Sequence, residues 1–296
     1  MAAVRKRFLF VINHVSGRKT LDWETVILEH FKDYEHDLEF YELPEKFTAD
    51  TVRDKIKTHK PDYVVAVGGD GTINLLASCV MNTPMKLGIL PAGSANGMAK
   101  ELNISDQPAE AMDTIVKGFT RSISLISINE HISMHLSDIG LNAYMLREFE
   151  RRGVRGFWGY MMATIKVLSK RKALRVNLHF DGKNVKVRAD IIIIANATRY
   201  GTGVLVNPVG KLDDNVFEII AVNDLSVKDL LKTSLHTLRL DENKAEIFQT
   251  SELHLTSDKP VHFQVDGEYL GKVKEIKAKL MRGCVTVVVP ESSVQT

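Results

Sequence analysis

The sequence has 296 residues, and because domains commonly run to ~100–200 residues, this length favours two domains over one. Hydrophobic residues make up 44% and charged residues 26% of the chain, which excludes an intrinsically disordered or collagen-like protein. The 39 Lys and Arg against 37 Asp and Glu leave a formal net charge of +2, so bulk charge gives no case for a nucleic-acid partner.

Cysteine usage and apolar runs narrow the class of protein further. Cys79 and Cys284 stand far apart and outside any spacing that binds zinc, which is typical of a reduced, cytoplasmic chain. The apolar run from Phe8 to Ile12 is too short for a signal peptide, and the run from Ile191 to Ala195 has the length of a strand. We therefore expect a cytoplasmic protein that meets lipid, if at all, at the membrane surface.

The first half of the chain alternates apolar strands with amphipathic helices. Strands are predicted at 8–13, 38–43, 63–67 and 87–90, and helices at 23–31, 49–57 and 73–81. Because helical crossovers join parallel strands and cover both faces of their sheet, this half is predicted to be a three-layer α/β domain. Ligands of such sheets bind at the carboxyl ends of the strands.

After about Ser124 short strands and turn residues replace this pattern. Strands are predicted at 124–129, 132–136, 175–181, 184–195, 216–222, 251–257, 261–265, 275–280 and 284–289, and helical insertions at 143–170 and 227–240. Asp-Gly pairs at Asp181 and Asp266 are typical of tight hairpins. The second half is therefore predicted to be mostly antiparallel, with a boundary near Ser124.

A glycine-rich turn, Gly68-Gly69-Asp70-Gly71-Thr72, stands directly between the strand at 63–67 and the helix at 73–81. Glycine lets the backbone approach an oxygen-rich ligand, and the helix N-terminus offers unpaired N–H groups, so the turn resembles a phosphate cradle. A carboxylate inside it, Asp70, implies a cation between itself and the phosphates. The alternative is a tight turn in which Asp70 only caps the helix.

Two further polar turns end neighbouring strands. One follows the strand at 87–90 and contains Gly93, Ser94 and Asn96, and the other begins at Asn13 after the first strand. Three such turns at one sheet edge are explained better by a single nucleotide site that they surround than by three independent helix caps.

These motifs together resemble the diacylglycerol kinase catalytic family, the lipid kinases that include sphingosine and ceramide kinases. The matching segments are Gly68–Thr72, Pro91–Ala99, Asn13 with Ser16-Gly17, and Asp266-Gly267-Glu268, in the family's order over nearly the whole chain. The resemblance implies an α/β ATP-binding domain at 1–124 and a mostly antiparallel β-sandwich domain for the lipid substrate at 125–296. It implies ATP- and Mg²⁺-dependent phosphorylation of a lipid hydroxyl, such as that of diacylglycerol, in the cleft between them.

The resemblance also assigns roles to single residues. Asp70 would act on Mg²⁺ or its water shell, and Glu268 would be the general base that takes the proton from the lipid hydroxyl. Nucleotide contacts would come from Asn13, Gly68, Gly69, Asp70, Gly71, Thr72, Ile73, Asn74, Gly93, Ser94, Asn96 and Asp266. Taken alone, Asp266 to Glu268 reads as an ordinary hairpin turn.

A second, structural Mg²⁺ is implied by the segment from Lys211 to Val216. There Asp214 would supply a carboxylate, and Lys211 and Val216 would supply backbone carbonyls. An ordinary acidic turn is the equal alternative, because Asn215 stands where the family usually has glycine.

Several positions depart from the family pattern. Leu75, Gly97 and Ser124 replace acidic residues, which thins the acidic network to Asp70, with Asp138 as a candidate helper. Tyr144 stands where a sphingosine kinase carries an aspartate. A weak or inactive nucleotide- and lipid-binding member of the family therefore remains an alternative. An NAD kinase, which shares the GGDGT turn, is disfavoured because its other motifs are missing.

A basic, aromatic-rich segment follows residue 147. It contains eight cations between Arg147 and Lys172, with Phe149, Phe157 and Trp158 among them. Such a mixture suits peripheral contact with an anionic membrane, whereas a packed helix with a solvated basic face is the plainer reading. We expect a lipid substrate at the membrane surface and no nucleic acid, and leave a homodimer open.

Overall fold

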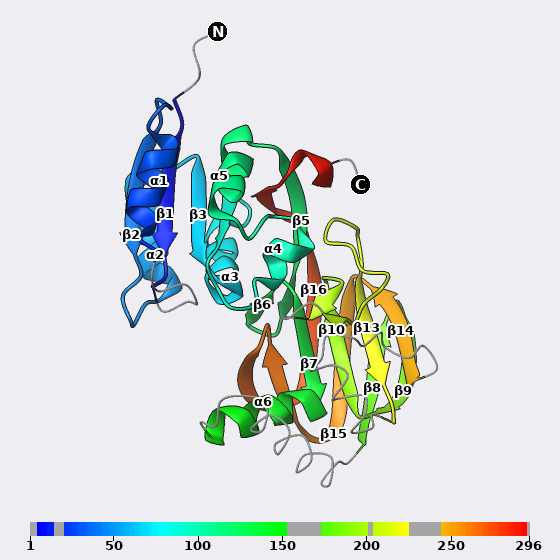
Figure 1. The fold of residues 1–296 in the computed structure, drawn as a ribbon. Helices are drawn as coiled ribbons and strands as arrows, with labels where there is room; N and C mark the ends of the chain where they lie inside the picture. The colour runs from blue at the N-terminus through cyan, green and yellow to red at the C-terminus, as the bar shows by residue number, and fades with distance from the viewer. Residues whose placement is uncertain (1–4, 15–20, 153–172, 201–203, 225–243, 295–296) are drawn as a thin grey trace. The chain divides into compact units, whose positions relative to one another are not determined.

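The computed structural model describes residues 5–14, 21–152, 173–200, 204–224 and 244–294 (Figure 1). The chain forms two compact units, Met1–Ile123 with Gly283–Thr296, and Ser124–Arg282. It passes from the first unit to the second within strand β5 (Thr120–Ile128) and returns within strand β16 (Glu268–Val288).

The first unit is built on a parallel sheet with the order β4-β3-β1-β2. Its strands are β1 (Arg7–Ile12), β2 (Asp37–Glu42), β3 (Tyr63–Gly68) and β4 (Lys86–Pro91). Thr286 and Val287 of β16 pair with β4 in parallel and extend the sheet. The continuous apolar runs of β1 and β3 suit strands buried on both faces, and both lie in the core.

Helices cover both faces of this sheet. They are α1 (Trp23–Phe31), α2 (Ala49–His59), α3 (Asp70–Val80), α4 (Gly97–Glu101) and α5 (Pro108–Lys117), followed at the C-terminus by the short helix η2 (Glu291–Ser293). Helix α1 contacts α5, while α2 contacts α3, so the two pairs form separate layers. The predicted three-layer α/β architecture is confirmed.

The second unit is a mostly antiparallel β-sandwich, as predicted. Besides β5 and β16 it contains β6 (His131–Ser133), β7 (Leu136–Gly140), β8 (Leu174–Phe180), β9 (Lys183–Ala189), β10 (Ile191–Ala195), β11 (Arg199–Tyr200), β12 (Val204–Leu205), β13 (Phe217–Val222), β14 (Ala245–Thr250) and β15 (Glu252–Val265). One run of pairing is β14-β13-β10-β7-β15, and β15 also pairs with β8 and β16. Helix α6 (Leu141–Arg152) follows β7.

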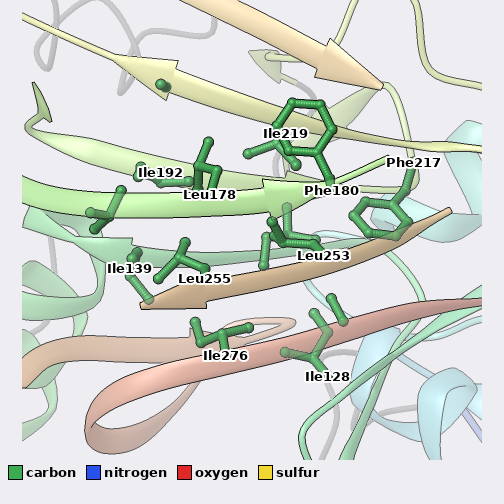
Figure 2. Close-up of a cluster of buried hydrophobic side chains, with 14 of the residues drawn as sticks. Ile128, Ile139, Leu178, Phe180, Ile192, Phe217, Ile219, Leu253, Leu255 and Ile276 are labelled. Atoms are coloured by element: carbon green, nitrogen blue, oxygen red, sulfur yellow. The ribbon is translucent and has the colours of Figure 1, made fainter. Parts of the chain in front are cut away.

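A large apolar cluster fills the space between the strands of the sandwich. Figure 2 shows Ile139 of β7, Leu178 of β8, Ile192 of β10, Leu255 of β15 and Ile276 of β16 gathered in this cluster. The opposite face of β7, β10 and β13 packs against Leu141 and Met145 of α6. Successive side chains of β7 therefore point into two different apolar clusters, one on each face of the strand.

The end of the chain differs from its predicted place. The second domain was expected to run from 125 to 296, but 283–296 belongs to the first unit. The reason is that Val285, Val287 and Val289 are buried there and Thr286 and Val287 pair with β4.

Some predicted elements also divide or merge. The predicted strand at 132–136 is split into β6 and β7, and the one at 184–195 is split at Asp190. Conversely, 251–257 and 261–265 form one strand, β15, with an irregularity between Thr256 and Val261. The insertion at 227–240 and most of 143–170 lie outside the described residues. None of the helices in the described ranges is long and apolar enough to cross a membrane.

Candidate functional site

The glycine-rich turn connects β3 to the N-terminus of α3. Gly69 is the N-cap, and its carbonyl accepts the N–H groups of Thr72 (2.9 Å) and Ile73 (3.1 Å). Within the described part of the chain, the N–H groups of Asp70 and Gly71 have no acceptor. The first turn of α3 therefore presents two donors and the positive end of the helix dipole at the carboxyl edge of the sheet.

The two glycine turns pack backbone against backbone. A Cβ on Gly93 would lie 2.5 Å from Gly69 Cα, and a Cβ on Gly69 would lie 3.1 Å from Gly93 Cα. Gly69 has a φ of −97°, so it is the close approach, and not a left-handed conformation, that favours glycine there. These two glycines hold the turns together. Gly68 is likewise structural, because a Cβ there would meet Thr72 Oγ1 at 2.4 Å.

Gly71 differs from the other glycines of the turn. It is exposed, and a Cβ built on it meets nothing within 4 Å. The fold therefore does not need a glycine there, whereas a ligand that approaches the N–H groups of the first turn would. Ser94, on the neighbouring turn, is also exposed and can offer its hydroxyl.

Asp70 joins the two turns through its carboxylate. Its Oδ2 accepts the N–H of Gly97 (3.0 Å) and its Oδ1 accepts the N–H of Met98 (2.9 Å) at the start of α4. Both carboxylate oxygens are thus engaged within the unit, and the role of Asp70 on Mg²⁺ or its water shell stays a prediction. Gly97, which stands in place of an acidic residue, contributes one of these N–H groups.

The other predicted nucleotide contacts divide into two groups. Asn13 and Thr72 bond each other, with Nδ2 donating to Oγ1 at 3.0 Å, which ties the end of β1 to α3. Asn96 has a φ of +51°, accepts the N–H of Gly93 (2.9 Å) and donates to Asp106 (3.1 Å), so it shapes its own turn. Ile73 is fully buried and cannot reach a ligand with its side chain.

Asn74, which follows Ile73 in α3, is only partly exposed.

The three turns that follow β1, β3 and β4 are brought together as predicted, although residues 15–20 of the first turn lie outside the described ranges. Gly71 and Ser94 are the predicted contacts that face outward with no competing partner in the described chain.

In the second unit, Asp266 and Gly267 form a two-residue hairpin between β15 and β16. Their φ values are +45° and +88°, as a type I′ turn requires, and Val265 faces Glu268 across it. Glu268 is exposed at the first position of β16. The predicted base thus lies directly after the two-residue turn.

The Asp266 carboxylate is turned inward, toward the segment that precedes and begins β7. It accepts hydrogen bonds from Ser133 Oγ (2.9 Å) and from the backbone N–H groups of Met134 (2.8 Å), His135 (3.1 Å) and Leu136 (3.0 Å). Burial raises the pKa of Asp266, and these hydrogen bonds oppose the rise. Asp266 therefore anchors the hairpin to the segment from Ser133 to Leu136, and its nucleotide contact stays a prediction.

The sequence analysis did not predict a buried polar pair on β7 and β15, on the face of these strands that packs toward α6. Asp138 of β7 and Gln264 of β15 face each other in register and are bonded through Gln264 Nε2 and Asp138 Oδ2 at 2.5 Å. Burial raises the pKa of Asp138 to about 6. From the sequence, Asp138 is only a candidate helper of Asp70, and no pattern marks Gln264.

The predicted structural Mg²⁺ segment forms an Asx turn before β13. Asp214 Oδ1 accepts the N–H of Val216 at 3.2 Å, and the Asp214 carbonyl lies 3.5 Å from Ser124 Oγ. Lys211 is exposed. The described ranges contain no group of three His, Cys, Asp or Glu that could hold a metal, so carbonyl oxygens would have to complete this site.

The second unit also contains a cavity of about 840 Å³ between the start of α6, β8 and the irregular part of β15. Its lining is mixed, with Leu141, Tyr144, Leu174, Arg175, Asp190, Lys259, Val261 and His262 among the residues. Tyr144 stacks on His262 with ring centroids 4.7 Å apart, and His262 Nδ1 lies 2.8 Å from the Tyr269 hydroxyl. The predicted membrane segment at 156–172 lies outside the described residues.

Comparison with known proteins agrees with these features. The diacylglycerol kinase catalytic domain profile matches residues 7–128, and the profile described as a YegS C-terminal NAD kinase beta sandwich-like domain matches 139–289. Among curated proteins, a Staphylococcus aureus diacylglycerol kinase is 23% identical over 278 residues. The alignment covers 91% of this chain and 88% of the staphylococcal protein. An uncharacterized Synechocystis protein is 26% identical over 88% of this chain, which spans 65% of that relative.

Solved structures show the same fold. A putative diacylglycerol kinase from Bacillus anthracis superposes with a TM-score of 0.79 at 19% identity, covering 97% of this chain and 96% of its own. An NAD kinase from Archaeoglobus fulgidus, solved in complex with ATP, gives a TM-score of 0.59 at 16% identity, with coverage of 98% and 96%. With both halves matched and the paired glycine turns in place, this chain belongs to the diacylglycerol kinase catalytic family.

Proposed function

We propose that this protein is an ATP-dependent kinase that phosphorylates the hydroxyl of a lipid of the diacylglycerol class. One observation carries the nucleotide part of the proposal. The turn at Gly71 combines two unpartnered backbone N–H groups with an open space that a Cβ would fill. A phosphate fits this arrangement because it supplies acceptor oxygens and negative charge at a helix N-terminus.

In this proposal ATP with Mg²⁺ supplies the γ-phosphoryl group when bound. The N–H groups of Asp70 and Gly71 and the hydroxyl of Ser94 would hold phosphate oxygens. Asp70 fixes the two turns relative to each other by binding the start of α4. Preformed donors of this kind stabilise charge on phosphate without reorganisation.

Glu268 is the proposed general base. Its exposed position leaves it open to a lipid hydroxyl, and the inward anchor of Asp266 restricts the motion of the hairpin that carries it. A carboxylate so placed can take the proton as the hydroxyl attacks phosphorus.

The cavity beside α6 is the proposed lipid site. Its apolar wall, with Leu141, Leu174 and Val261, suits an acyl chain, and Arg175 and Lys259 suit an anionic or polar head region. A lipid acceptor would be met at a membrane surface, and we propose peripheral contact for that reason.

The assay that tests this function is transfer of the labelled γ-phosphoryl group from ATP to acceptors in mixed micelles. The panel contains diacylglycerol, monoacylglycerol, sphingosine, ceramide and NAD. We expect transfer to a glycerolipid, and a loss of ~10²–10⁴-fold in turnover for Glu268→Gln with ATP binding retained. Full activity of Glu268→Gln would remove the base assignment.

The same panel decides between the alternatives. The engagement of both Asp70 oxygens within the unit favours, as a second candidate, a member that binds nucleotide and lipid without turnover. Saturable ATP binding with no labelled product from any acceptor would establish that candidate. Label in NAD alone would instead identify the activity of the more distant structural neighbour.

A further inference from the structure

Asp138 and Gln264 form a buried polar pair that the proposed reaction does not use. Asp138 is 1% exposed and Gln264 is fully buried, and they lie on the face of β7 and β15 that packs toward α6. Polar groups are rarely buried to this extent unless their hydrogen bonds are satisfied, and here the further partners lie at the start of α6 and in the Asp266-Gly267 hairpin.

The pair connects α6 to the Asp266-Gly267 hairpin through consecutive hydrogen bonds. On one side, Asp138 accepts from the backbone N–H of Ala143 (3.0 Å) and from Asn142 Nδ2 (2.5 Å), both in the first turn of α6. On the other side, Gln264 Oε1 accepts the N–H of Gly267 at 2.7 Å. Gly267 directly precedes Glu268.

We propose that Asp138 and Gln264 are positioning residues that fix the hairpin carrying Glu268 and couple its geometry to α6. The inference rests on the proposed role of Glu268 in the kinase reaction. The cavity is lined by Leu141 and Tyr144 of the same helix, so occupation of the cavity and orientation of the base are linked through this pair.

The direction of the Gln264 amide is the key to the coupling. An ionised Asp138 can only accept, so it draws the NH₂ group toward itself and leaves Oε1 for Gly267. A protonated Asp138 can donate a hydrogen bond to Gln264 Oε1, so the Gln264 amide can turn over. Its NH₂ group then faces the N–H of Gly267, and two donors stand against each other. The hairpin then loses one of its anchors.

Titratable groups in the described part of the chain share this face of the sheet with Asp138. On this face α6 contributes Tyr144, β15 contributes His262, β16 contributes Tyr269 and β13 contributes Glu218, while β10 places Ile193 opposite Asp138. Burial dominates the raised pKa of Asp138, and the bonds from Asn142, Gln264 and Ala143 lower it. Protonation near pH 6 is therefore accessible.

Nuclear magnetic resonance tests the coupling without any assay of activity. The sequence contains three Asp-Gly pairs, at Asp70, Asp181 and Asp266, so labelling Asp at the carbonyl and Gly at nitrogen selects the amides of Gly71, Gly182 and Gly267. The variants Gly71→Ala and Gly182→Asn each remove one signal and identify the third.

We expect the Gly267 amide to shift with a midpoint near pH 6 in the wild type, while Gly71 and Gly182 stay constant. In Asp138→Asn this titration should disappear. A titration that persists in Asp138→Asn would trace it to Asp266 and overturn the proposal, as would a Gly267 signal that does not move between pH 5 and 7.5.

A reversed pair tests the positioning role in turnover. Gln264→Glu places two carboxyl groups together, so we expect a tenfold or larger loss of kcat at pH 7.5, a smaller loss at pH 6, and an unchanged KM for ATP. Adding Asp138→Asn to this variant makes residue 138 the amide donor and residue 264 the carboxylate acceptor. At least half of the lost kcat should then return at pH 7.5.

Gln249→Glu is the matched control. Gln249 donates to the buried carboxylate of Glu218 at 3.0 Å and has no link to the hairpin, so the variant creates a similar carboxyl pair elsewhere in the unit. Its kcat should stay within twofold of the wild type. An equal loss in Gln249→Glu, or no rescue by the reversed pair, would contradict the positioning role. A wild type inactive on every lipid would refute the base assignment and the turnover claim, and the Gly267 titration would still decide whether the pair controls the hairpin.

Discussion

Asp70 illustrates how one carboxylate can hold two glycine turns together. It sits between two unpartnered N–H groups of α3 and the first N–H groups of α4, and it bonds the latter. Charge-assisted bonds to backbone N–H groups are about twice as strong as neutral ones. The motif's aspartate therefore stabilises the pairing of the two glycine turns, whatever further part it takes with a cation.

This role changes the expected effect of Asp70→Asn. An amide keeps one acceptor and turns a donor toward an N–H group, so the variant should lose about 1–3 kcal/mol of unfolding free energy. Thermal and urea unfolding would measure the loss. Asp50→Asn is the control, because Asp50 is exposed in the first turn of α2 and bonds only Arg53 among the described residues. An Asp70→Asn protein as stable as the Asp50→Asn protein would show that the bonds to α4 contribute nothing.

Asp266 permits a parallel test in the second unit. Asp266→Asn removes the charge that serves four donors, so we predict a loss of at least about 2 kcal/mol in unfolding free energy. Asp181→Asn is its match, since Asp181 also begins an Asp-Gly hairpin with positive φ but accepts a single side-chain bond, from Thr250. The two variants should differ by more than about 1 kcal/mol, and equal losses would contradict the anchoring role.

At the scale of elements, α6 begins on a buried carboxylate. The N–H of Leu141 donates to the Asp190 carbonyl (3.1 Å) and that of Ala143 to Asp138, so two N–H groups of the first turn are satisfied inside the protein. Gly140, at φ +109°, is required there because a Cβ would lie 2.5 Å from the Asp190 carbonyl oxygen. The helix start is thereby fixed to both β7 and the end of β9.

The raised pKa of Asp138 predicts a pH-dependent stability. An acid whose pKa is about 6 in the folded state and about 3.8 when unfolded binds more protons folded between these values, so unfolding free energy falls as pH rises through that window. Relative to Asp138→Asn, the wild type should lose up to about 3 kcal/mol between pH 4 and pH 7. Urea unfolding at both pH values measures it, and a difference independent of pH would contradict the assignment.

Element prediction succeeded where one physical pattern decided the outcome. The continuous apolar runs at 8–13 and 63–67 and the four-residue spacing of Trp23, Ile27 and Phe31 gave the correct strands and helix. Helix α5 and strand β14 were missed. Helix α5 begins at Pro108, directly after a polar stretch, and β14 is an edge strand whose sequence, AEIFQT, has weak alternation and is half exposed.

At the scale of the whole molecule, the chain leaves the first unit at Ile123 and returns to it at Gly283. Local sequence could not reveal this return, because a strand that pairs with β4 and one that pairs within the sandwich have the same apolar pattern. Likewise, β16 was expected as two strands, since its turn-like residues at 281–283 interrupt the pattern while the backbone continues.

The return of the chain predicts a stabilising role for its last strand. Val287 is fully buried beside β4, so Val287→Ala should cost about 1–3 kcal/mol and weaken ATP binding indirectly through the first unit. Val294→Ala, at a side chain 47% exposed, should cost less than about 0.5 kcal/mol. Hydrogen exchange of β4 amides would locate the effect, and unchanged protection in Val287→Ala would contradict it.

The parts of the candidate site that could be predicted are those with a local sequence pattern, namely glycine-rich turns and helix starts. The three turns and the Asp-Gly hairpin followed from spacing alone. The direction of each side chain did not. Asp70 and Asp266 point into backbone N–H groups, Asn96 closes its own turn, and the Asp138–Gln264 pair joins residues 126 positions apart, which no local pattern marks.

The central claim is that phosphate groups of ATP rest on the N–H groups of Asp70 and Gly71. Isothermal titration of ATP with Mg²⁺ into the wild type, Gly71→Ala and Gly182→Asn tests it most directly, because neither added side chain meets an atom of the fold within 4 Å of its Cβ. We predict that Gly71→Ala retains the wild-type unfolding midpoint and binds ATP at least tenfold more weakly, while Gly182→Asn binds normally. Wild-type ATP affinity in Gly71→Ala would contradict the claim.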